Sequence, residues 1–128
     1  MLALLLLAAV PILAWCYASV HRPTSRWMIT GAALGAVISP LSLGLYATFF
    51  LFPIGLPTGL IGLVSLLFHG EPGYEAAMWL GLVPSHQLVS GVGQVYVELL
   101  NGVFWWLLYG FAGFIVDRVR FAYLMRHE

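Results

Sequence analysis

The chain has 128 residues, of which 62% are hydrophobic and only 8% are charged. Soluble domains carry roughly a quarter charged residues, so this composition excludes an ordinary water-soluble protein and predicts an integral membrane protein in contact with the lipid bilayer. Five arginines, no lysine and five acidic residues give a net charge of zero. That balance leaves no basic surface for a phosphate backbone, so we expect no nucleic-acid partner.

The first apolar segment covers residues 2–20. No basic residue precedes it, and it continues through Trp15 and Tyr17, which is unusual for a cleaved export signal. We therefore interpret it as a retained membrane helix. A short polar linker follows, with Arg22 and Arg26 at its two ends. Its proline, Pro23, ends the first helix.

The second apolar segment, residues 27–52, contains no charged residue and is long enough to cross a bilayer. Pro53 and Pro57 then interrupt the chain. The third segment, residues 57–68, is short for a crossing, so it is either a crossing or a re-entrant piece that enters the bilayer and returns.

Residues 69–98 are more polar and are predicted to be interfacial or extramembrane. The fourth segment, residues 99–116, is bracketed by Glu98 and Asp117, whose separation of 19 residues corresponds to about 30 Å of helix, one crossing. The tail, residues 117–128, carries three arginines and is predicted to lie at the cytoplasmic surface.

Together these segments predict an all-α, polytopic helical bundle that forms one transmembrane domain over residues 1–128, with about four apolar segments. Arginine in short loops favours the cytoplasm, which places both arginine groups and the C-terminus inside. In that scheme the third segment is either re-entrant or lies along the outer face. Two alternatives are four crossings with Arg22 and Arg26 outside, or five crossings with residues 76–97 as the additional one. An arginine-only set of basic residues suggests a bacterial chain, so we expect the inner membrane.

Small residues recur at helical spacing on the second and fourth segments and predict close helix packing. They are Gly31, Gly35, Ser39, Gly102, Gly110 and Gly113. Such stripes either pack the chain's own helices together or recruit another protein.

A second set of residues could form a polar, proton or metal site at one membrane face, because imidazole and carboxylate groups bind metals and relay protons. The set is His69, Glu71, Glu75, His86, Glu98 and Asn101. The alternative is a solvated acidic loop, since the histidines lack the i, i+4 spacing of a helical zinc site. No motif indicates a cofactor, although Trp105, Trp106 and Tyr109 could line a ligand site or simply pack.

The leading functional hypothesis is a non-catalytic membrane protein that acts through helix contacts, as an accessory or assembly subunit or as a binder of another membrane component. Its partner would be another membrane protein or a second copy of this chain. The alternative is a small oligomeric transporter or channel, suggested by Pro53 and Pro57 breaking an apolar run. An intramembrane enzyme ranks third.

Overall fold

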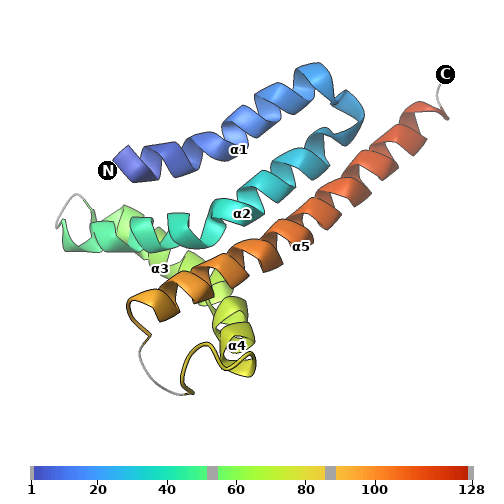
Figure 1. Ribbon diagram of the computed structural model, residues 1–128. Coiled ribbons are helices and arrows are strands. Elements are labelled where there is room, and N and C mark those ends of the chain that lie inside the picture. The colour runs from blue at the N-terminus through green and yellow to red at the C-terminus, as the bar shows by residue number, and fades with distance from the viewer. Residues whose placement is uncertain (1, 52–54, 86–88, 127–128) are drawn as a thin grey trace.

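The computed structural model describes residues 2–51, 55–85 and 89–126. Its elements in chain order are α1 (Leu2–His21), η1 (Pro23–Ser25), α2 (Arg26–Ala47), η2 (Thr48–Phe50), α3 (Leu56–His69), α4 (Glu71–Trp79) and α5 (Val92–Leu124). No strand occurs in these three ranges, and α1, α2 and α5 lie side by side, whereas α4 runs in another direction (Figure 1). The predicted all-α helical bundle is confirmed.

Three helical stretches are long and apolar enough to cross a membrane: Leu2–His21, Pro23–Phe50 and Val92–Leu124. The helix that contains the third predicted segment, α3, has 14 residues and spans only about 21 Å, less than the roughly 30 Å of a hydrocarbon core. With its 9 residues, α4 is shorter still. The described part of the chain therefore has three helical stretches of crossing length and two short α-helices.

The short helix α3 runs back along α2 in the opposite direction. Gly62 lies against the backbone of Tyr46, and one turn later Ser65 meets Ser42, with 2.6 Å between their hydroxyl oxygens. Later residues of α3 thus contact earlier residues of α2. After the end of α2, the chain therefore turns back and α3 runs towards the middle of the bundle.

The next helix, α4, leads outward again along the first turns of α5. Gly73 contacts Val97 and Asn101, and Ala77 and Val83 then form a small apolar cluster with Val97. Helices α3 and α4 therefore form a hairpin that enters and leaves at the same end of the bundle. Residues 69–98, expected to be interfacial or extramembrane, contain α4 and the first turns of α5.

The most extensive contact in the fold joins α2 and α5, which lie side by side (Figure 1). Three glycines bring the two backbones so close that a Cβ atom would collide with a carbonyl group of the facing helix: Gly31 at Tyr109, Gly35 at Trp105, and Gly113 at Trp27. Gly110 is buried beside Ala32. Apolar side chains elsewhere on these helices are exposed, as in a protein surrounded by lipid.

The turn between α1 and α2 lies beside the C-terminal part of α5 (Figure 1). Asp117 of α5 fixes this arrangement, because its two carboxylate oxygens accept the backbone N–H groups of Trp27 and Met28 at 3.2 and 2.9 Å. The carboxylate of Asp117 accepts hydrogen bonds from otherwise unpaired N–H groups in the first turn of α2, and it faces the positive end of the α2 helix dipole. At the same end the guanidinium of Arg26 lies 4.2 Å above the ring of Trp15.

All five arginines consequently lie at one end of the bundle, in or beside the α1–α2 turn and in the last turns of α5. They are Arg22, Arg26, Arg118, Arg120 and Arg126. The acidic residues of α4 and of the first turns of α5 lie at the other end, and they are Glu71, Glu75 and Glu98. The two ends are called below the arginine end and the acidic end.

We expect Gly35→Leu to lower the free energy of unfolding by about 1–3 kcal/mol, because the added side chain collides with the Trp105 backbone and cannot move aside. Circular dichroism during denaturation in mixed detergent micelles measures this change. Ala36→Leu is the matched control, since Ala36 is exposed one residue further along α2. Equal stability of the two variants would contradict the close α2–α5 contact.

Candidate functional site

A network of hydrogen-bonded polar side chains joins α2 and α5 near the acidic end. The hydroxyl of Ser39 donates to one oxygen of Glu98 at 2.7 Å, and the amide of Gln94 donates to the other oxygen at 3.0 Å. Ser39 is fully buried, whereas Glu98 is partly exposed. The carboxylate therefore has a partner for each oxygen and retains acceptor capacity for a third group.

Asn101, one turn after Glu98, binds the hairpin and is fully buried. Its side-chain oxygen accepts the backbone N–H of Gly73 at 2.6 Å, and its amide donates to the carbonyl of Gly70 at 2.9 Å. The same amide lies 3.4 Å from the Ser39 hydroxyl. Asn101 thus satisfies backbone groups at the junction of α3 and α4 and links them to α2.

His69 ends α3 and is held from both sides of its ring. Nδ1 lies 2.8 Å from the carbonyl oxygen of Ser65, which can only accept, so Nδ1 carries the proton. Nε2 therefore accepts from the hydroxyl of Tyr109, 2.6 Å away on α5. The indole of Trp105 donates to the backbone carbonyl of His69 at 3.0 Å. The ring is engaged in helix packing.

The predicted polar set is only partly brought together. Glu98 and Asn101 share one network through Ser39, while Glu71 and Glu75 are exposed on α4. His86 lies outside the described residues. Within the described ranges, no three His, Cys, Asp or Glu side chains lie close enough to hold a metal ion.

Ser65, Tyr109 and Trp105 are residues whose roles the sequence did not reveal. Ser65 stands four positions before His69, so helical spacing could have placed them on one face. Tyr109 and Trp105 were expected either to line a ligand site or to pack. They lie 40 and 36 residues from His69 in the chain, and no local pattern points to these contacts.

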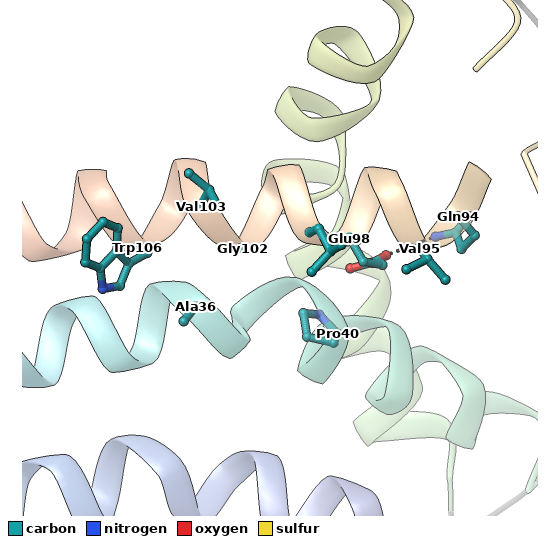
Figure 2. A pocket seen from close by; sticks show the side chains of 9 residues that line it. Ala36, Pro40, Gln94, Val95, Glu98, Gly102, Val103 and Trp106 are labelled. Carbon is teal, nitrogen blue, oxygen red and sulfur yellow. Dashed lines mark hydrogen bonds between the residues drawn. The ribbon is translucent and has the colours of Figure 1, made fainter. Parts of the chain in front are cut away.

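A groove runs along the α2–α5 contact on a different face of α5 from the hairpin, and it consists of three joined hollows. The first, the Glu98 hollow, has a volume of about 480 Å³ (Figure 2). It is lined by Ala36, Pro40, Gln94, Val95, Glu98, Leu99, Gly102, Val103 and Trp106. The lining is almost entirely apolar and includes two small residues, Ala36 and Gly102.

The groove continues towards the arginine end. The middle hollow, about 670 Å³, shares Ala36 and Trp106 with the Glu98 hollow. The Arg118 hollow, about 280 Å³, shares Met28 and Phe114 with the middle hollow. Three hollows with shared lining residues therefore follow one another from Glu98 to Arg118.

The polar network can hold helices together, whereas the groove can accept an apolar partner from the bilayer. Comparison of this chain with known protein families, with curated proteins and with solved structures gave no match. Its role is therefore argued from the geometry of these two features.

Replacing Asn101 by Leu keeps the branched shape and the number of heavy atoms of the side chain but removes the bonds to Gly70 and Gly73. We expect the hairpin to lose about 1–2 kcal/mol of local stability, because backbone groups at the α3–α4 junction are left unpaired. Hydrogen–deuterium exchange of the amides in α4 should accelerate. Glu75→Gln is the control, because it changes an exposed side chain of α4, the helix whose exchange is measured. Unchanged exchange in the Asn101 variant would show that the hairpin is held by other contacts.

Proposed function

We propose that the chain is a non-catalytic integral membrane protein that acts through helix contacts, as an accessory or assembly subunit that binds another membrane protein at the Glu98 hollow. The observation that carries this proposal is the open, apolar hollow between α2 and α5. Its lining includes the small residues Ala36 and Gly102, at which the backbone of a third helix can approach closely, as small residues permit in membranes.

The hydrogen bonds of His69 and Asn101 support a structural role for these two side chains, rather than a catalytic one. His69 is bonded at both ring nitrogens, and the Asn101 side chain is bonded through both its oxygen and its nitrogen. Neither residue lines the three hollows. An enzyme needs a reactive group that faces its substrate, and these groups face the protein.

Glu98 indicates the chemistry of the partner. It lines the hollow and has no cationic partner in the part of the chain that the structure describes. A charged group near the membrane boundary gains from an opposite charge, because the local dielectric constant is low. The proposed partner is therefore an apolar transmembrane helix that presents a Lys, Arg or His side chain towards Glu98.

The arrangement of charge supports an orientation. Because all five arginines lie at one end, the bias of arginine towards the cytoplasm places the arginine end and the C-terminus inside. The acidic end and the N-terminus then face outward, with three crossings and the hairpin inserted from outside. A bacterial inner membrane is the proposed location.

The test compares two equal substitutions on exposed helix surfaces. Ala36→Leu fills part of the Glu98 hollow, whereas Ala112→Leu lies on α5 outside all three hollows. We expect native mass spectrometry of gently purified protein to show a stoichiometric partner with the wild-type chain and with Ala112→Leu, and its loss with Ala36→Leu. Retention of the partner by Ala36→Leu would refute binding at this hollow.

A small oligomeric transporter or channel is the second candidate, favoured by the bonded Glu98–Ser39 pair between two crossing helices. If it is correct, liposomes containing only this purified chain should conduct protons or a small cation, and Glu98→Gln should abolish the flux because the variant cannot ionise. A fluorescent pH indicator inside the liposomes reports the proton flux. A flux lost in this variant would replace the accessory proposal.

A further inference from the structure

We infer that the arginine-end part of the groove binds one anionic phospholipid, with its phosphate in the Arg118 hollow and an acyl chain in the middle hollow. This site lies in a different part of the groove from the Glu98 hollow. It requires no partner protein, so it stands or falls separately from the proposed accessory role.

The Arg118 hollow offers donors for a phosphate. Its lining includes the guanidinium of Arg118 and the hydroxyl-bearing residues Thr24 and Ser25. The guanidinium lies 5.0 Å above the ring of Phe114 and forms no hydrogen bond or ion pair with another described residue. Arginine binds phosphate through paired N–H groups, and hydroxyls add further donors.

Asp117 also lines this hollow and would by itself repel an anion. Its two oxygens, however, accept the N–H groups of Trp27 and Met28 at the start of α2. Part of the negative charge is therefore balanced by the positive end of the α2 dipole. Arg118 remains the unpaired charge of the hollow.

The middle hollow matches an acyl chain. It is lined by Met28, Ile29, Ala32, Ala33, Ala36, Trp106, Leu107, Gly110, Phe111 and Phe114, none of which carries a charge. Its volume of about 670 Å³ falls within the roughly 300–1,000 Å³ typical of small-molecule sites. Because the middle hollow and the Arg118 hollow share Met28 and Phe114 as lining residues, they are adjacent, and one lipid can place its headgroup in the Arg118 hollow and a chain in the middle hollow.

The length of this part of the groove matches a lipid in one leaflet. From Arg118 to Trp106 the α5 helix has 12 residues, a rise of about 18 Å. That distance is close to half of a hydrocarbon core of roughly 30 Å with its boundary layer, which is the depth of one leaflet. The polar donors of the Arg118 hollow would lie at the level of the lipid headgroups. The apolar middle hollow extends from there over the depth of one leaflet. Together the two hollows match the length of a phospholipid.

The headgroup is tested by titrating the full chain, purified and delipidated in detergent, with phosphatidylglycerol and following the bound state by native mass spectrometry. We expect one retained lipid per chain and an affinity about fivefold lower for Arg118→Gln, the loss associated with one basic residue near a lipid surface. Arg120→Gln, two residues further along the same helix, should bind like the wild type. Equal losses in the two variants would overturn the assignment, since they would indicate only general surface attraction.

The acyl chain is tested with Ala33→Leu, which fills the middle hollow, against Ala112→Leu outside it. Phosphatidylglycerol should bind about tenfold more weakly to Ala33→Leu, because the chain and the new side chain compete for one space. Thermal unfolding followed by circular dichroism establishes that both variants fold. Unchanged affinity in a folded Ala33→Leu protein would overturn the tail site.

Two further ligands separate a phospholipid from simpler occupants. Phosphatidylcholine should bind more weakly than phosphatidylglycerol, and inorganic phosphate should not displace the bound lipid. Equal affinity for the two lipids would overturn the role of Arg118, and displacement by phosphate would identify a small-anion site in place of a lipid site.

Discussion

The close approach of α2 and α5 is the constraint on which the other features of this protein depend. In a bilayer the surrounding lipid is as apolar as the helices, so burial of apolar surface contributes little to helix association, and packing must supply it. Gly31 and Gly35 allow the two backbones to touch, and Gly113 does the same beside the start of α2. The contact sets Ser39 opposite Glu98 and leaves the open groove along one side.

The α3–α4 hairpin illustrates how short helices are stabilised inside a membrane protein. Helix ends leave unpaired carbonyl and N–H groups, which cannot be left exposed to hydrocarbon. Here the carbonyls of His69 and Gly70 accept bonds from Trp105 and Asn101, and the same Asn101 accepts the N–H of Gly73. Two side chains of α5 therefore complete the turn between the short helices, which makes this part of the polar network structural.

Charge and apolar surface are arranged along one direction. The arginines gather at one end and the glutamates of α4 and α5 at the other, and the groove connects them on the lipid-exposed side of the α2–α5 pair. Glu98 lines the groove near one end and Arg118 lines it near the other, and neither forms an ion pair within the described ranges. The partner helix and the phospholipid proposed above follow from this arrangement, because each would supply the missing charge in an apolar setting.

By itself the sequence determined the membrane class and the all-α fold, because both depend on composition and on the length of uninterrupted apolar runs. It also named Glu98 and Asn101 in the candidate polar set, and their spacing of three residues is a local relation that puts them on one helical face. Only the tertiary structure decided that α3 and α4 return to the same end, and that Asn101 and Tyr109 bind the hairpin across 28 to 40 residues of chain. Hydropathy measures whether a segment prefers lipid to water. Which helices touch depends on the fit of specific surfaces and on hydrogen bonds between residues distant in the sequence, and neither is encoded in a local pattern.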